Sequence, residues 1–196
     1  MTEFLLVRHG QSTWNAAGKW QGQADPPLSA LGRLQAEHAG RSVGSVDLIV
    51  TSDLERAHHT GLIIGEAIGV GPVVVEPALR ERDAGEWSGK TRDEIEVEWP
   101  GYLAAGDRPP GWEPQDQLME RALDALHRLE AKHPSAEVLV ITHGGVVYAI
   151  EEHHGEPWSR IGNLEARRLR VERGTTTLGD RVELIDHDEI TVPEQL

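Results

Sequence analysis

The sequence predicts an α/β fold, a three-layer α/β/α sandwich built on a mostly parallel central sheet. Short apolar runs of strand type alternate along the chain with segments in which apolar residues recur at helical spacing. Several of these runs end abruptly in polar residues, as expected where the carboxyl ends of parallel strands carry a binding site. A length of 196 residues suits one domain with a sizeable core, so we expect a single domain over residues 1–196.

The first half of the chain predicts strands and helices in alternation. In order, the expected elements are a strand at 4–7, a loop at 15–27, a helix at 29–42, a strand at 46–50, a helix at 52–68, a strand at 72–76 and a loop at 79–89. Ser29 has the side chain of a helix N-cap, because its hydroxyl can accept a backbone N–H of the first turn. Residues 52–55, Ser-Asp-Leu-Glu, fit a capping box, which marks the start of the second helix.

The second half continues the same alternation after an irregular segment. A second capping box, at residues 91–94, predicts a short helix through residue 99, and Asp116 is expected to cap a helix that runs to about residue 133. Residues 100–114 are rich in Gly, Pro and Trp, so we expect 90–116 to be an insertion, either a lid that shapes the site or a packed connection. The remaining expected elements are a strand at 137–142, a helix at 145–155, an edge hairpin of strands 167–171 and 181–185 around a turn at Gly174 and Gly179, and a loose tail at 189–196.

Composition limits the classes of function. With 19 basic and 33 acidic residues the net charge is −14, which disfavours nucleic acid or an anionic membrane as a partner. The absence of cysteine excludes disulfides, thiol catalysis and zinc–thiolate sites, and it permits the cytoplasmic location that we expect. No window approaches the ~18 apolar residues of a membrane span, and no signal peptide is expected. The sequence does not predict an oligomeric state.

Basic side chains gather at the carboxyl ends of the expected strands. Arg8 and His9 follow the first strand, Arg56 lies in the first turn after the second, and His143 with two glycines follows the strand at 137–142. An arginine fork suits phosphate oxygens, and an imidazole can act as a nucleophile or a base. A cation in the first turn of a helix opposes the helix dipole, which a bound anion would relieve. The sequence therefore predicts an anion-binding site at this edge of the sheet.

Residues 6–15, Leu-Val-Arg-His-Gly-Gln-Ser-Thr-Trp-Asn, resemble the signature of the histidine phosphatase superfamily, also called the phosphoglycerate mutase-like family. Four further segments are similar to motifs of that family in the same order, namely residues 21–32, 52–60, 79–89 and 140–145. Five ordered matches are far more specific than any one of them. The resemblance implies the phosphoglycerate mutase-like form of the α/β sandwich.

The resemblance also implies an activity, that of a phosphomonoester hydrolase acting on a small phosphorylated substrate without a metal or another cofactor. It implies that His9 attacks phosphorus and becomes a phosphohistidine, while Glu81 donates and then accepts a proton. Because Glu81 must be protonated in the first step, activity is expected to be higher on the acid side of neutrality. The side chains and backbone expected to hold the phosphoryl group or line its pocket are Arg8, Asn15, Gln21, Gly22, Arg56 and His143.

The chain departs from the family pattern in two places. Many phosphatases of the family have Gly-Glu-Ser near the end of the insertion, whereas residues 111–114 here are Gly-Trp-Glu-Pro. Asn163 matches the start of an Asn-x-Ser motif, but Glu165 replaces the serine, so no role is carried over to it. The adjacent histidine pairs at 58–59 and 153–154 lie on expected helices, where neighbouring side chains diverge, and we predict no metal site there.

Two alternatives remain open at this point. A cofactor-dependent phosphoglycerate mutase would use the same pocket, although residues 82–89 are more similar to the phosphatases, and the insertion offers only Lys90, Arg92 and Arg108 for a substrate carboxylate. A non-catalytic module that binds a phosphate for regulation is the other alternative. The sequence does not identify the substrate, for which a sugar phosphate, a phosphoglycerate derivative and a phosphorylated protein are all candidates.

Overall fold

The computed structural model of the protein describes residues 1–186 and 190. Within them one sheet has the strand order β3-β2-β4-β1-β5-β6. Its strands are β1 Thr2–Arg8, β2 Leu48–Thr51, β3 Val74–Val75, β4 Glu137–Thr142, β5 Glu165–Glu172 and β6 Thr175–Glu183. The first four strands pair in parallel, whereas β5 is antiparallel to β1 and β6 is antiparallel to β5. The predicted α/β class with a mostly parallel sheet is confirmed.

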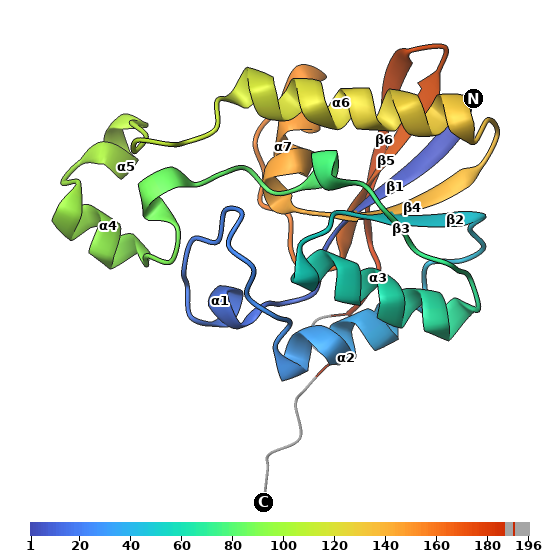
Figure 1. The fold of residues 1–196 in the computed structure, drawn as a ribbon, viewed down its shortest axis with the longest axis horizontal. Helices are drawn as coiled ribbons and strands as arrows, with labels where there is room; N and C mark the ends of the chain where they lie inside the picture. The colour runs from blue at the N-terminus through green and yellow to red at the C-terminus, as the bar shows by residue number, and fades with distance from the viewer. Residues whose placement is uncertain (187–189, 191–196) are drawn as a thin grey trace, which may run out of the picture.

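Helices cover both faces of the sheet (Figure 1). The helices α6 (Gln115–Lys132) and α7 (Gly144–His153) lie on one face, and α2 (Ala30–Ala39) and α3 (Glu55–Ile68) lie on the other. The shorter elements are α1 (Thr13–Ala16), α4 (Arg92–Glu98), α5 (Tyr102–Ala105) and the 3₁₀ turns Pro77–Leu79 and Gly85–Trp87. Among the described residues, none of these helices has the length and hydropathy needed to cross a membrane.

The alternation of side chains along β1 explains the two apolar layers. Phe4 and Leu6 pack into the layer formed with α6 and α7, whereas Leu5 and Val7 pack into the layer formed with α2 and α3. Because successive residues of a strand face opposite sides of the sheet, a strand buried on both faces is a continuous apolar run. The central position of β1, between β4 and β5, therefore follows from its composition.

Two of the predicted helix caps are present. Ser29 precedes α2, and its Oγ accepts the backbone N–H of Gly32 at 3.0 Å. Thr91 begins the predicted capping box, in which its hydroxyl accepts the N–H of Glu94 and the Glu94 carboxylate accepts the N–H of Thr91. These local hydrogen bonds satisfy N–H groups that have no partner inside the helix.

The other two predicted caps are wrong. The chain stays extended through Leu54, so α3 begins at Glu55 and not at the serine of the proposed box. The N–H of Glu55 instead donates to Asp25 Oδ1 at 2.6 Å, a carboxylate from a distant loop. The helix α6 begins after Pro114, which places Asp116 inside its first turn and not at its cap. In both cases a partner or a backbone restriction outside the local motif determines where the helix starts.

The predicted strand lengths were less accurate than the strand positions. The strand expected at 72–76 is limited to Val74–Val75, and the hairpin strands β5 and β6 are longer than expected. Gly174 lies in the hairpin turn with φ +77°, but Gly179 lies within β6, opposite a register shift between Arg167 and Leu169. Of the tail expected at 189–196, all residues except 190 lie outside the described part of the chain.

The insertion at 90–116 carries α4 and α5 and lies with α1 at one end of the molecule (Figure 1). Trp112 anchors it, because its ring packs edge to face against Trp20 at 5.7 Å and against Trp87 at 5.6 Å. Trp87 is completely buried. The insertion is therefore fixed to the loop that follows α1, and the two segments together form the wall of a cleft at the carboxyl ends of the strands.

Candidate active site

The ends of three parallel strands bring the candidate side chains together. Arg8 is paired in register with Thr142, and Thr51 is paired with Ile141, so β1, β4 and β2 end at the same edge of the sheet. His9, Ser52 and His143 are the residues that follow these strand ends, and all of them are buried. The sequence-based expectation of a polar site at this edge agrees with their placement.

His9 is held in one tautomer. Its Nδ1 lies 2.6 Å from the carbonyl oxygen of Gly10, and a carbonyl can only accept, so Nδ1 carries the proton. Its Nε2 therefore keeps a lone pair, which accepts a hydrogen bond from Arg56 Nε at 3.2 Å. Asn163 fixes the backbone of His9 by donating from Nδ2 to its carbonyl at 2.8 Å. A neutral imidazole with an accessible lone pair is the form needed for a nucleophile.

His143 packs against His9 with ring centroids 5.1 Å apart. Its Nε2 lies 2.7 Å from Ser52 Oγ, which also accepts the N–H of Leu54 at 3.4 Å. The other ring nitrogen, Nδ1, is buried and has no hydrogen-bond partner among the described residues. A buried ring nitrogen without a partner is uncommon in proteins, and it marks His143 as a residue whose packing alone does not account for its polar atoms.

Arg56 lies beneath the cleft and is almost completely buried. Its guanidinium donates to the carbonyl oxygens of Gly22 and Ala24 at 2.9 and 2.8 Å and to His9 Nε2. Burial lowers the pKa of Arg56 to about 10, so the side chain stays charged at neutral pH. No carboxylate forms an ion pair with it in the described part of the chain, and a buried cation of this kind favours binding of an anion nearby.

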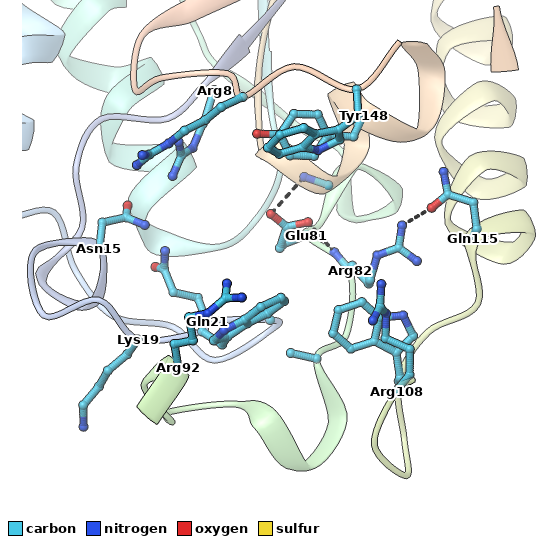
Figure 2. Close-up of a pocket in the computed structure, with 18 of the residues that line it drawn as sticks. Arg8, Asn15, Lys19, Gln21, Glu81, Arg82, Arg92, Arg108, Gln115 and Tyr148 are labelled. Carbon is cyan, nitrogen blue, oxygen red and sulfur yellow. Dashed lines mark hydrogen bonds between the residues drawn. The ribbon is translucent and has the colours of Figure 1, made fainter. Parts of the chain in front are cut away.

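Glu81 lies at the cleft, held by two backbone N–H groups. Its Oε1 accepts the N–H of Arg82 at 2.7 Å, and its Oε2 accepts the N–H of Gly145 at 3.2 Å (Figure 2). Arg8 lies nearby and donates from Nη1 to the carbonyl of Ile161 at 2.7 Å. The carboxyl group therefore has a defined position in the cleft that His9 also lines.

Behind Glu81, a partly buried ion pair between Arg121 and Glu113 holds its loop in place. Arg121 donates to the carbonyl oxygens of Ala78, Arg80 and Glu81 and to both carboxylate oxygens of Glu113. Glu113 belongs to the segment that departs from the family pattern, and its carboxylate also accepts the N–H of Asp83. Although residues 111–114 differ from the family pattern, Glu113 and Arg121 therefore connect the insertion to the loop that carries Glu81.

A Gly145→Ala substitution tests the placement of Glu81. A Cβ at this position would lie 2.0 Å from Glu81 Oε1, and the end of a flexible side chain can move, so the carboxylate is expected to be displaced while the fold is kept. Since alanine favours a helix relative to glycine, thermal stability should not fall. We expect kcat for an alkyl phosphate to fall by roughly 10²-fold, the scale of general acid catalysis. Gly144→Ala, whose Cβ would make ordinary contacts at 3.4 Å with Tyr148 and 3.8 Å with Arg8 Nε, should lose far less; equal losses in the two variants would contradict this placement.

The predicted residues divide between the floor and the walls of a cleft of 1020 Å³. Those that line it are Arg8, His9, Asn15, Gln21, Gly22 and Glu81, whereas Arg56 and His143 lie beneath it and do not line it. Asn15 Oδ1 accepts the N–H of Ser12, which leaves the NH₂ group of Asn15 as its available donor. Gln21 Oε1 accepts a hydrogen bond from Ser12 Oγ at 2.6 Å. All eight predicted residues are thus brought to one place, and their individual roles remain predictions.

Several residues at the cleft had no role in the sequence analysis. They are Lys19, Arg82, Trp112, Gln115, Tyr148, Glu152, Trp158 and Arg160. The Arg82 guanidinium donates to the carbonyl of Glu113 at 2.8 Å and to Gln115 Oε1, so the side chain extends from beside Glu81 toward Gln115 (Figure 2). Arg82 lies within the motif at residues 79–89, and Trp112 lies in the insertion that was expected to shape the site. The others lie on segments with no recognised motif. Outside this set, Asn163, which donates to the carbonyl of His9, had a signal in the incomplete Asn-x-Ser motif.

Protonation of the buried histidines links stability to pH. Burial and the charges of Arg56 and Arg8 lower the pKa of His9 well below its ordinary value of 6.5. Below about pH 6.5 the unfolded chain therefore binds a proton at this histidine that the folded protein excludes, and stability is lost as the pH falls toward the folded pKa, by about 1.4 kcal/mol per unit. We expect His9→Gln to reduce this slope between about pH 6.5 and pH 5.5, measured by urea unfolding.

The exposed His153 provides the matched control, since His153→Gln should keep the slope of the unmodified protein. An unchanged slope in His9→Gln would contradict the neutral state of His9. The same lowered pKa keeps the His9 lone pair available in mildly acidic solution, so the nucleophile is expected to limit activity only well below pH 6.5.

Comparisons with known proteins agree with the fold and the motifs. Residues 4–179 match the model of the histidine phosphatase superfamily, branch 1. The chain is 38% identical over 160 residues to a metal-independent phosphoserine phosphatase of Arabidopsis thaliana, covering 76% of this chain and 67% of the relative. It is 32% identical to phosphoglycerate mutase-like protein 4 of the same plant, covering 97% and 83%.

Among solved structures, a mycobacterial glucosyl-3-phosphoglycerate phosphatase in complex with VO3 superimposes with a TM-score of 0.81 at 30% identity, covering 90% of this chain and 96% of that one. The family model covers most of the chain, including all five segments on which the resemblance was based. The protein therefore belongs to the histidine phosphatase superfamily.

Proposed function

We propose that the protein hydrolyses phosphomonoesters through a phosphohistidine on His9. The observation that carries this proposal is that the buried His9 is neutral and has a lone pair on Nε2. Arg56 donates a hydrogen bond to this nitrogen, and Arg8 and Glu81 line the same cleft. Phosphoryl transfer needs an in-line nucleophile, cations around the equatorial oxygens and a proton for the leaving group. The relatives named as phosphatases support the same reaction.

In the first step, the Nε2 lone pair of His9 attacks phosphorus and the bond to the leaving oxygen breaks. That oxygen takes the proton of Glu81, so the leaving group departs as a neutral alcohol. Arg56 Nε donates to His9 Nε2, and this N–H must turn to a phosphoryl oxygen before the lone pair can react. Arg8, which lines the cleft, and His143, whose buried Nδ1 has no partner among the described residues, are the other donors proposed for the phosphoryl oxygens.

In the second step, Glu81 is a carboxylate and accepts a proton from water. The water oxygen attacks phosphorus, the bond from phosphorus to His9 Nε2 breaks, and inorganic phosphate leaves. His9 returns to the neutral tautomer set by the carbonyl of Gly10. One carboxyl group thus acts as acid and then as base, and the enzyme returns to its starting protonation state.

We further propose that no metal is needed, because the guanidinium groups and His143 supply the donors that a metal would otherwise provide. The name of the Arabidopsis phosphoserine phosphatase supports this point. The substrate is proposed to be a small phosphorylated molecule and the location the cytoplasm, with neither nucleic acid nor a membrane as a partner. The net charge of −14 supports the exclusion of polyanionic partners.

Phosphate release from an aryl phosphomonoester, measured across pH in the presence of excess chelator, tests this function. Hydrolysis that survives the chelator is the expected result. Loss of activity with chelator and its return with added metal would contradict metal independence. No hydrolysis of any phosphomonoester would favour a non-catalytic phosphate-binding module.

A phosphoglycerate mutase remains the second candidate, and the lining of the cleft by Arg92 and Arg108 is the observation in its favour. Such a mutase would return the phosphoryl group to a hydroxyl of a phosphoglycerate and not to water. Incubation with 3-phosphoglycerate separates the two reactions, since a phosphatase releases inorganic phosphate and a mutase forms the 2-phospho isomer. We expect release of phosphate without the isomer.

A further inference from the structure

The connection between α7 and β5, residues 156–164, is attached to the phosphoryl-binding residues at several points. We call this segment the α7–β5 loop. Ile161 is completely buried; its carbonyl accepts Arg8 Nη1 at 2.7 Å, and its N–H donates to Tyr148 Oη at 3.0 Å. Asn163 donates to the carbonyl of His9 at 2.8 Å. The inner side of the loop therefore cannot move without moving Arg8 and His9.

The outer side of the loop is fixed as well. Arg181 donates to the carbonyl oxygens of Ser159 and Arg160 at 2.7 and 2.9 Å, and it is held in turn by both carboxylate oxygens of the buried Glu151. A backbone held on both sides presents its remaining side chains in a defined position. Two of these side chains, Trp158 and Arg160, line the cleft.

Trp158 is a large aromatic side chain that lies mostly exposed to solvent. It is 75% exposed, and its ring centroid lies 6.0 Å from that of Tyr148 at an interplanar angle of 47°. Large apolar side chains on a rigid backbone beside a cleft are the usual anchors for a ligand, because little conformational entropy is lost when a ring stacks on them. The indole face of Trp158 is thus a candidate platform for the leaving group.

Arg160 adds a charge to this platform. It is exposed and forms no ion pair with a carboxylate within residues 1–186 and 190, and it lines both the main cleft and a smaller hollow of 390 Å³ that shares Arg8. Six basic residues line the main cleft, against two acidic ones, Glu81 and Glu152, although the whole chain carries a charge of −14. A phosphoryl group alone does not require so many cations. The excess indicates a substrate with a second negative charge.

The size of the cleft agrees with a leaving group larger than glycerate. Its volume of 1020 Å³ lies at the upper end of the range of small-molecule sites, which are about 300–1000 Å³. In the proposed function the phosphoryl group binds near His9 and the leaving oxygen lies near Glu81, and both residues line this cleft. The rest of the leaving group must therefore extend along the walls, where the α7–β5 loop is one side.

We propose that the α7–β5 loop is a leaving-group subsite in which Trp158 stacks against a sugar ring and Arg160 binds an acidic group of the same substrate. This inference rests on the proposed phosphatase function and names its substrate class, phosphomonoesters of acidic molecules that carry a sugar ring. Both residues determine specificity and take no part in proton or phosphoryl transfer.

Three phosphomonoesters distinguish the contribution of Trp158 from that of Arg160. Glycerol 3-phosphate carries neither an acid nor a ring, 3-phosphoglycerate carries the acid alone, and glucosyl-3-phosphoglycerate carries both. Trp158→Ala is expected to reduce kcat/KM for the ring-bearing ester by on the order of 10-fold, mainly through KM, and to leave 3-phosphoglycerate unchanged, with recovery in Trp158→Phe. Arg160→Gln is expected to reduce kcat/KM for both acidic esters by on the order of 10-fold and to leave glycerol 3-phosphate unchanged.

Arg41→Gln provides the matched control, because Arg41 is exposed and lies in the turn after α2, outside the residues that line the cleft. Both tested side chains are exposed, so their replacement should not affect folding. If the unmodified protein hydrolyses the esters but the two variants lose activity equally on all three, or on none, the subsite is contradicted while the phosphatase function stands. If the unmodified protein hydrolyses no phosphomonoester, including an aryl phosphate, the proposed function itself fails.

Discussion

Replacement of His9 by alanine is expected to lower kcat/KM for phosphomonoester hydrolysis by on the order of 10⁴-fold or more, the scale seen when a covalent nucleophile is removed. The bond from phosphorus to nitrogen cannot form without Nε2, and no second side chain at the floor of the cleft can replace it. His143 Nε2 is hydrogen-bonded to Ser52 Oγ, and His143 does not line the cleft. Steady-state assays with an aryl phosphate and with an alkyl phosphate should show the loss for both substrates.

The exposed His153, which lies outside the cleft, provides the matched control for this measurement. His153→Ala should keep its activity, and circular dichroism should show that His9→Ala is folded. A loss below about 10-fold in folded His9→Ala would mean that water attacks phosphorus directly, since nucleophiles contribute far more than this. The loss should be mainly in kcat, because the cations that bind the phosphoryl group remain.

Replacement of Glu81 by glutamine should reduce hydrolysis in a way that depends on the leaving group. An alkoxide is a poor leaving group and needs the proton of Glu81, so hydrolysis of an alkyl phosphate should fall by roughly 10²- to 10⁴-fold. A nitrophenolate leaves without a proton, so formation of the phosphohistidine from an aryl phosphate should be affected much less. Rapid-mixing measurements of the first turnover with the two substrates distinguish these cases.

Glu86→Gln, on the same loop, is the control for a general change of charge near the site. Glu86 does not line the cleft, and its replacement should leave both rates unchanged. Equal losses for alkyl and aryl esters in the first turnover of Glu81→Gln would contradict the role of Glu81 as the proton donor. They would favour a role in binding or in positioning Arg82, whose N–H donates to Glu81.

The layers of the fold could be predicted because each strand and helix carries its own pattern. β1 is a continuous apolar run since it is buried on both faces, and Ser29 and Thr91 cap their helices through contacts within four residues. Ser52 failed as a cap for a physical reason. Its hydroxyl lies beside His143, a residue 91 positions away, and no local pattern reports that contact.

The centre of the candidate site could be predicted and its surroundings could not. His9, Arg56 and His143 lie at strand ends or in a first helical turn, where the topology of a parallel sheet brings them together. Arg121 holds the loop of Glu81 through hydrogen bonds to backbone carbonyls that lie at least 40 positions away in the sequence. Such contacts carry no sequence signature. The position of the α7–β5 loop could not be predicted for the same reason, because its hydrogen bond with Arg8 joins residues that are 153 positions apart.

The central claim is that the reaction passes through a phosphohistidine on His9, and trapping this intermediate tests it most directly. In Glu81→Gln an aryl phosphate should still phosphorylate His9, while hydrolysis of the intermediate, which needs the carboxylate as a base, should be slow. The intermediate should therefore accumulate. After an alkaline quench, mass spectrometry of the peptides is predicted to find one phosphoryl group per chain, on His9. Phosphate release with no phosphorylated His9, or a phosphoryl group on any other residue, would contradict the account.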